Sequence, residues 1–86
     1  MITVDQAADI LLKVYKDAQI HSVHPYKGNY LFVAPNKNLG LYGDYNDPYY
    51  VVDKKNGLIS RITPLEDFEG FDEAFSKPEL ECKRRE

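Results

Sequence analysis

The sequence predicts an α+β domain in which an N-terminal amphipathic helix packs on an antiparallel sheet of three to four strands, followed by a short C-terminal helix. Three observations support this fold class. Apolar residues recur at helical spacing over residues 4–18, two β-rich runs flank a glycine-containing turn at residues 54–57, and a second helical pattern follows Pro64. With 86 residues the chain is expected to form one α+β domain at residues 1–76 and a charged C-terminal tail at 77–86.

The first helix is expected to begin with a capping box, in which Thr3 is the N-cap and Gln6 lies three residues later. Apolar residues then recur on one side of the helix while charged residues occupy the other, so one face must be buried. The apolar set is Val4, Ala7, Ala8, Leu11, Leu12, Val14, Tyr15 and Ala18. We expect this helix to end near Asp17.

The next segments have the pattern of the sheet that this helix covers. Residues 19–24 are predicted as a first strand, and a turn follows in which Gly28 and Asn29 tolerate left-handed backbone geometry. Residues 29–34 are predicted as a strand that is apolar on both sides, which is typical of the centre of a sheet. Its alternation places Tyr30, Phe32 and Ala34 on one face and Leu31 and Val33 on the other.

After a predicted loop at residues 35–46, a β-hairpin is the strongest feature of the sequence. Residues 49–53 and 58–63 are rich in β-branched and aromatic side chains, and residues 54–57 supply the turn between them. A second capping box at residues 63–66 then predicts a helix that begins at Pro64.

The second helix is expected to bury an apolar stripe and to expose an acidic run at residues 66–73. Because Gly70 weakens the middle of this helix, a short 3₁₀ turn followed by a helix from Phe71 is an alternative. The stripe comprises Leu65, Phe68, Phe71, Ala74 and Phe75.

Charge and composition exclude several classes of partner. The formal net charge of −3 gives no general attraction to phosphate backbones or anionic lipid, so we expect neither nucleic acid nor membrane as a partner. The sequence has no signal-peptide pattern or apolar run long enough to span a membrane, and its one cysteine, Cys82, is expected to be exposed in the tail. These features predict a cytoplasmic protein, in a bacterium or an infected host cell.

No catalytic, metal or cofactor signature is present in the sequence. His21 and His24 are three residues apart on a predicted strand, which places them on opposite faces and argues against joint metal binding. Cys82 has no histidine nearby, and the glycines form no phosphate-binding loop. We therefore predict a protein that is not an enzyme and uses no cofactor.

Four tyrosines close together provide the candidate partner-binding site. Tyr42, Tyr45, Tyr49 and Tyr50 fall within nine residues, and tyrosine suits the centre of a protein interface because it combines a large apolar body with one polar tip. The alternative is that Tyr49 or Tyr50 packs inward on the sheet. The first interpretation predicts a non-catalytic protein that acts by binding an unidentified protein partner.

Two other modes of association are open. The acidic run at residues 66–73 could occupy the basic site of an enzyme, as in a toxin-immunity protein or an inhibitor of a host enzyme. An edge strand at residues 19–24 could instead pair with a second copy and form a homodimer.

The hairpin and the segment after it resemble small uncharacterised proteins of Gram-positive bacteria and of their phages and prophages. The shared features are an Asp-Pro-Tyr-Tyr-x-Val-Asp-Lys strand at residues 47–54, a glycine turn at Gly57, and a Pro-x-x-Asp-x-x-Gly-Phe-x-x-Ala helix at residues 64–74. A more distant similarity, to bacterial toxin-immunity proteins, is limited to residues 52–57. The first resemblance implies one helix, four strands and a second helix, and a phage or prophage accessory role. Neither resemblance implies catalytic residues.

Overall fold

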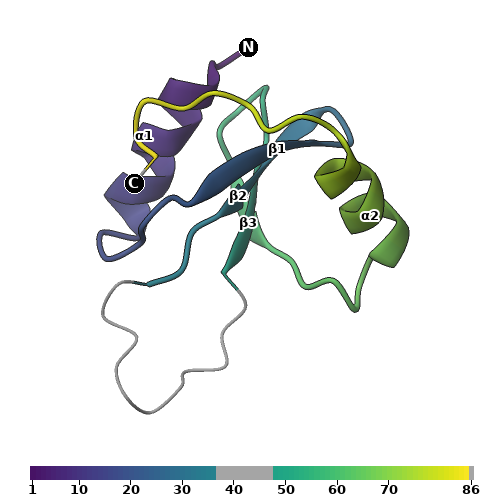
Figure 1. Ribbon diagram of the computed structural model, residues 1–86. Helices are drawn as coiled ribbons and strands as arrows, with labels where there is room; N and C mark the ends of the chain where they lie inside the picture. Colours follow the sequence, from purple (N-terminus) through teal and green to yellow (C-terminus); the bar gives the residue numbers. More distant parts are fainter. Residues whose placement is uncertain (37–47, 86) are drawn as a thin grey trace.

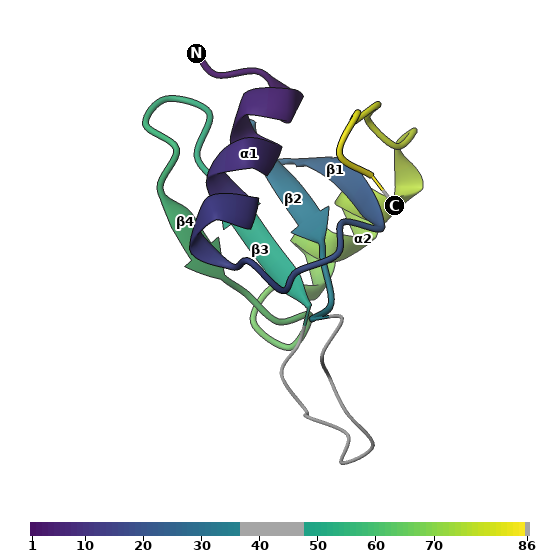
Figure 2. The ribbon, with the colours of Figure 1, turned by 90° about the vertical axis from the view of Figure 1, so that its left-hand side faces the viewer.

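The computed structural model describes residues 1–36 and 48–85 and has an α+β fold, as the sequence predicts. The strands form one antiparallel sheet in the order β1-β2-β3-β4. The two helices cover opposite faces of this sheet, so the molecule has three layers (Figures 1 and 2). The elements are α1 (Val4–Val14), β1 (Ser22–Tyr26), β2 (Asn29–Val33), β3 (Tyr49–Val52), β4 (Ile59–Arg61) and α2 (Phe68–Ser76).

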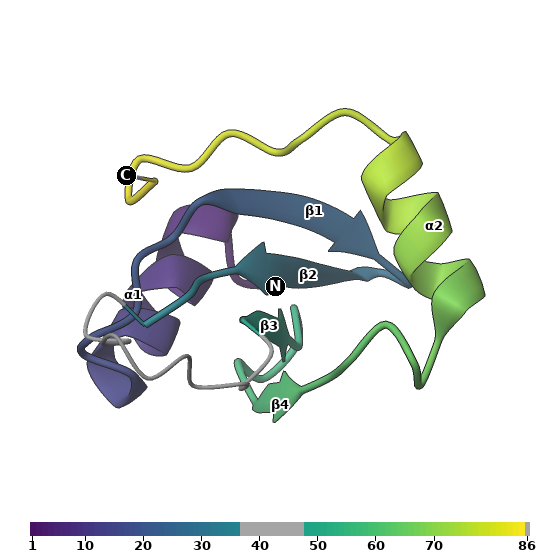
Figure 3. The ribbon, with the colours of Figure 1, turned by 60° about the horizontal axis from the view of Figure 1, so that its bottom comes forward.

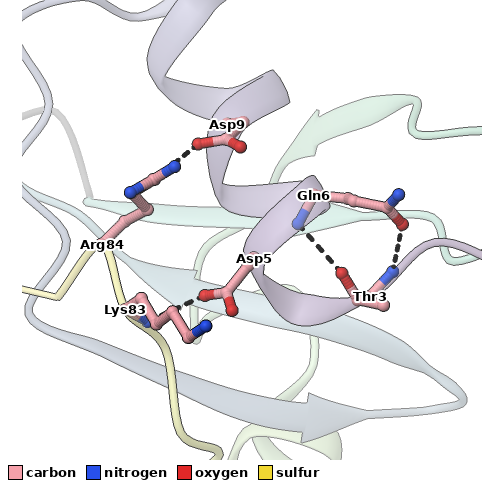
Figure 4. Close-up of polar contacts among 6 residues, drawn as sticks. All are labelled: Thr3, Asp5, Gln6, Asp9, Lys83 and Arg84. Carbon is pink, nitrogen blue, oxygen red and sulfur yellow. Dashed lines mark hydrogen bonds and ion pairs between the residues drawn. The ribbon is translucent and has the colours of Figure 1, made fainter.

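The capping box of α1 is confirmed. The Thr3 hydroxyl accepts a hydrogen bond from the Gln6 amide at 3.2 Å, and the Gln6 side chain accepts one from the Thr3 amide at 2.8 Å (Figure 4). The helix ends at Val14, earlier than predicted, because Tyr15 leaves the helical conformation as its C-cap. The Tyr15 ring then packs on Tyr50 of β3 at a centroid distance of 4.7 Å, which explains why the apolar pattern continues past the last helical residue.

The hairpin of β1 and β2 turns on Lys27 and Gly28, which have φ values of +48° and +80°. Positive φ at both central residues is what a two-residue type I′ turn requires. The turn predicted at residues 26–29 is therefore confirmed, but its left-handed residues are Lys27 and Gly28 and not Gly28 and Asn29. β1 also lies further along the chain than the predicted strand at residues 19–24. β1 is an edge strand, so its outer side pairs with no further strand of the sheet and needs no amide donor. It can therefore include Pro25, which has no amide proton.

β2 is buried on both faces, as predicted. Tyr30 and Phe32 contribute to the core beneath α1, whereas Leu31 contributes to the core beneath α2. The core beneath α1 is the larger of the two, because it also takes side chains from β3 and from the segment that follows α1.

The start of α1 is tied to the loop between β3 and β4. The Ile2 amide donates to the Lys54 carbonyl at 2.9 Å, and the Tyr30 hydroxyl donates to the Ile2 carbonyl at 2.9 Å. Gly57 has a φ of +73° and approaches Ile10 so closely that a Cβ atom there would lie 2.8 Å from its Cδ1 atom. The turn glycine predicted in this hairpin therefore serves both turn geometry and helix packing.

The second helix begins later than predicted. The Glu66 carboxylate accepts from the Thr63 amide at 2.8 Å, but this capping arrangement closes only a single turn, and the helix starts at Phe68 with Asp67 as its N-cap. Asp67 leaves the helical conformation because its carboxylate is bound elsewhere, to the hairpin of β1 and β2.

The Asp67 carboxylate connects α2 to that hairpin, because it accepts hydrogen bonds from two hairpin side chains and from one backbone amide of α2. Its Oδ2 atom accepts from the Tyr26 hydroxyl at 2.6 Å and lies 2.6 Å from Lys27 Nζ, while its Oδ1 atom accepts from the Gly70 amide at 3.0 Å. These hydrogen bonds, from Lys27 first, then Tyr26 and Gly70, lower the pKa of Asp67 to about 2. Burial, followed by the bond to Asp67, raises the pKa of Tyr26 to about 12.

Only part of the predicted apolar stripe of α2 is buried. Phe71 and Ala74 pack on the sheet, but Leu65, Phe68 and Phe75 are exposed, which corrects the prediction for those three residues. The buried contact is narrow because α2 lies mainly over β1, the edge strand (Figure 3).

The C-terminal tail, predicted as a charged segment, runs from α2 alongside β1 to α1 (Figures 1 and 3). The Leu80 amide donates to the Val23 carbonyl at 2.8 Å, and Leu80 and Cys82 pack against the larger core. Cys82 is half-buried and not the exposed thiol predicted, and burial raises its pKa. The tail therefore occupies the edge that was considered for homodimer pairing.

Replacing Gly70 with alanine is expected to destabilise the fold. Helix propensity alone favours alanine by about 1 kcal/mol in a helix interior. At this position, however, a Cβ atom would lie 2.8 Å from Tyr26 Cε1 and would also collide with the Asp67 carboxylate. Overpacking of this kind costs about 1–3 kcal/mol, so Gly70→Ala should lower the free energy of unfolding measured in urea. Asp72→Ala, at an exposed position of the same helix, is the control and should change stability little; a more stable Gly70→Ala protein would contradict the close packing.

Candidate functional site

The structure describes two of the four tyrosines predicted to bind a partner. Tyr50 is 8% exposed and packs beneath α1, with the Arg61 guanidinium 5.4 Å from its ring centroid. Tyr49 points to the opposite face and packs edge-on against Phe71 at 5.0 Å. Tyr42 and Tyr45 lie outside the described residues. Tyr50 is thus a core residue, and partner binding by this group stays a prediction.

A different surface is exposed and apolar, on the outward side of α2 and the turn before it. Leu65 is 81% exposed, Phe68 is 65% exposed and Phe75 is 44% exposed. Large apolar side chains are usually covered, so three within residues 65–75 form an unusual concentration for so small a domain. This surface also extends toward the sheet, because the Phe75 ring lies 6.3 Å from that of the half-buried Tyr49.

Carboxylates lie among these apolar side chains. Phe68, Asp72 and Phe75 are spaced at i, i+4 and i+7, which places them in a row along α2 with the carboxylate between the two rings. Glu69 and Asp72 form no hydrogen bond or ion pair with any residue that the structure describes. We call this surface, made by Leu65, Phe68, Glu69, Asp72 and Phe75, the aromatic-acidic face.

The carboxylates at the two ends of α2 are compensated, in contrast to those of the aromatic-acidic face. Asp67 is paired with Lys27, and Glu73 is paired with Lys77 at 3.0 Å. Among the described residues, negative charge without an ion-pair partner therefore lies on Glu69 in the first turn and on Asp72 in the middle of the helix, beside exposed rings. Such a surface can bind a cation and an apolar group together, because a ring face and a carboxylate both attract positive charge.

A serine and a histidine interact on β1, beneath the end of α2. Ser22 Oγ lies 2.8 Å from His24 Nε2, and the His24 ring packs on Phe75 at a centroid distance of 4.3 Å. His24 is 8% exposed, and its Nδ1 atom has no hydrogen-bond partner among the described residues. A catalytic serine–histidine pair uses an acid at that second nitrogen to orient the ring. Within residues 1–36 and 48–85 no acid is hydrogen-bonded to that nitrogen.

The structure also locates the two histidines and can be searched for metal-ligating groups and membrane-spanning helices. His21 is exposed and His24 is buried, so the two do not converge on one point. No group of three potential metal-ligating side chains occurs within residues 1–36 and 48–85. In the same residues, neither helix has the length and apolar content needed to cross a membrane.

The sequence predicted the acidic part of this face, within residues 66–73, but not its exposed rings, because these have the same spacing as buried ones. Phe68 and Phe75 are three residues before and four residues after Phe71, which is the spacing of a buried stripe. The signal that distinguishes them is the aspartate that caps the helix, because it shortens α2 and fixes its rotation on the sheet.

Buried His24 is expected to make stability fall on mild acidification. Burial lowers its pKa from 6.5, with Glu79 opposing this in part, so the unfolded chain binds the proton more readily than the folded protein. The stability contributed by neutral His24 is complete above pH 6.5 and is lost as the pH falls from there toward the folded-state pKa. Urea unfolding at about pH 7.5 and about pH 5.5 should show this loss. His24→Phe should abolish it and exposed His21→Gln should retain it; an unchanged slope in His24→Phe would contradict the assignment.

Comparisons with known proteins identify no relative of this chain. No protein-family model matches the chain, and searches of curated proteins and of solved structures give no match. The resemblance to phage and prophage proteins therefore stays a prediction, and the candidate site is defined by its own geometry.

Proposed function

We propose that the protein is a non-catalytic binding protein that docks a protein partner through the aromatic-acidic face. The observation that supports this proposal is the exposure of Leu65, Phe68 and Phe75 beside two carboxylates that have no counter-ion in the part of the chain that the structure describes. Exposed apolar side chains contribute favourable free energy only when a partner covers them, and aromatic residues are the commonest energetic anchors of protein interfaces.

The chemistry of the face defines the class of partner. An apolar partner surface without charge would leave Glu69 and Asp72 buried and unpaired, which is costly. A surface that carries lysine or arginine next to apolar side chains would pair these carboxylates and cover the rings at the same time. The partner is therefore a protein with a cationic, partly apolar site, and not a nucleic acid, because the net charge of −3 repels phosphate.

Two biological settings fit this chemistry. The first is a phage or prophage accessory protein that binds a host protein, which the resemblance of the hairpin and of residues 64–74 favours. The second is a toxin-immunity protein or an inhibitor of a host enzyme that occupies a basic site, which the unpaired carboxylates of α2 favour. Both settings use the same face of the molecule.

Substitutions on the aromatic-acidic face are expected to abolish partner binding without unfolding the protein. Phe68→Ser removes an exposed ring and Asp72→Lys reverses the charge beside it, so each should lower capture of a partner from bacterial lysate by tenfold or more, on the order of 1.4 kcal/mol or more. The melting temperature should stay nearly unchanged, because both side chains are exposed. Quantitative mass spectrometry of proteins retained on the immobilised variants measures the effect.

The matched control is Val14→Ser, which removes a 61% exposed apolar side chain from α1 on the other side of the sheet. It should leave capture unchanged. Partner capture that survives Phe68→Ser and Asp72→Lys together would contradict this face as the docking surface, and capture that is insensitive to salt would contradict the cationic partner.

A further inference from the structure

The C-terminal segment at residues 79–85 makes a set of contacts that connects α1 to the edge of β1. Its backbone donates from Leu80 to the Val23 carbonyl at 2.8 Å and from Lys83 to the Asp5 carboxylate at 2.8 Å. The Arg84 guanidinium donates to Asp9 at 2.7 Å (Figure 4). The segment thus bonds to β1 on one side and to α1 on the other.

Further contacts join the end of the segment to β1. Arg85 Nε donates to the His21 carbonyl at 2.8 Å, and its guanidinium pairs with Glu79 at 3.1 Å. The β1 edge therefore receives two donors from this segment, at carbonyls two residues apart in sequence. That arrangement imitates part of a fifth strand without extending the sheet.

The attachment of this segment is weak for its length. Its apolar anchors are the half-buried Leu80 and Cys82, whereas its ion pairs are about half exposed and contribute little net free energy. An open cavity of about 420 Å³ adjoins it, lined by Asp5, Glu81, Cys82, Lys83 and Arg85. Apart from Asp5, this open cavity is lined by the segment's own residues, so much of the segment faces solvent. A segment with few buried apolar contacts can open locally below the free energy of global unfolding.

We propose that residues 79–85 are a detachable strap seated in a peptide-binding groove between α1 and β1, that its backbone hydrogen bonds and the pairing of Arg84 with Asp9 together hold it there, and that the strap of a second copy can occupy the groove in its place. The occupant is identified by complementarity, because Asp5 accepts from the Lys83 backbone amide, Asp9 pairs with the Arg84 guanidinium, and Leu80 packs against the larger core. In the folded monomer the tethered strap has an effective concentration of about millimolar, so it outcompetes a second copy unless it is weakened. This proposal is independent of the aromatic-acidic face.

Cys82, the one cysteine of the chain, reports strap opening directly, because it is half-buried only while the strap is docked. We expect Arg84→Asp to raise the rate of its reaction with a thiol reagent such as DTNB several-fold in the full chain, and Asp9→Arg to do the same. The double variant Asp9→Arg with Arg84→Asp should restore the slow rate. Salt should accelerate the reaction in the wild-type protein.

The control for this experiment is Glu73→Gln, which removes an exposed ion pair of the same kind on α2. It should leave the thiol reaction unchanged. Reaction rates that follow only the global stability of each variant in urea, or a charge swap that fails to restore the slow rate, would overturn the detachable strap.

Occupation of the groove by a second copy is tested with a fluorescein-labelled peptide of residues 77–86. Measured by anisotropy, it should bind the full-length variant Leu80→Asp with Arg84→Asp, whose own strap is disabled, at least tenfold more tightly than it binds the wild-type protein. A peptide carrying the same two substitutions should bind neither. Should the double variant not fold, as judged by circular dichroism, Arg84→Asp alone serves in its place. Equal binding to both proteins, or binding to neither, would overturn the exchangeable groove.

Discussion

The architecture depends on one constraint, which is that β2 is apolar on both faces. Phe32 is fully buried beneath α1, and the adjacent Leu31 is fully buried on the opposite side of the same strand. A strand of this kind is stable only with a layer on each face, because either apolar row would otherwise remain in water. A chain of 86 residues must therefore build two covering layers from short elements.

The two layers are unequal, and the difference explains where side chains are exposed. α1 buries Ala7, Ala8 and Leu11 completely against the larger core. α2 has nine residues, and the Asp67 carboxylate and Gly70 hold its first turn against Tyr26. Held at that end, α2 buries Phe71 and Ala74 but leaves the rings on either side only partly covered. The aromatic-acidic face is therefore a direct consequence of how the second layer is attached.

The way in which α2 is attached also affects how the aromatic-acidic face can act as a docking surface. A helix fixed by a buried tyrosine, a carboxylate and a close glycine contact cannot rotate to bury Phe68 without breaking those contacts. The helix that carries the exposed rings is therefore held in position by its own chain, so a partner does not have to order it on binding.

Elements with local signals could be predicted from the sequence, whereas contacts between distant segments could not. The capping box of Thr3 and Gln6 and the two apolar faces of β2 are set by neighbours within a few residues, and both are confirmed. The start of α2 was predicted wrongly because Asp67 bonds to Tyr26, 41 residues earlier in the chain. The docking of residues 79–85 likewise depends on Asp5 and Asp9, and no short window of sequence contains both partners.

Both edges of the sheet need protection, because a four-stranded antiparallel sheet presents unpaired backbone groups at each edge. β4 is three residues long, which leaves little edge for another strand to use. β1 is longer, and it is protected twice, by Pro25, which has no amide proton, and by the segment that bonds to the carbonyls of His21 and Val23. Because Pro25 limits any further strand to the first part of β1, a homodimer through direct pairing of two β1 strands would have few hydrogen bonds. Exchange of the C-terminal segment avoids that limit, since it reproduces contacts that the monomer already makes.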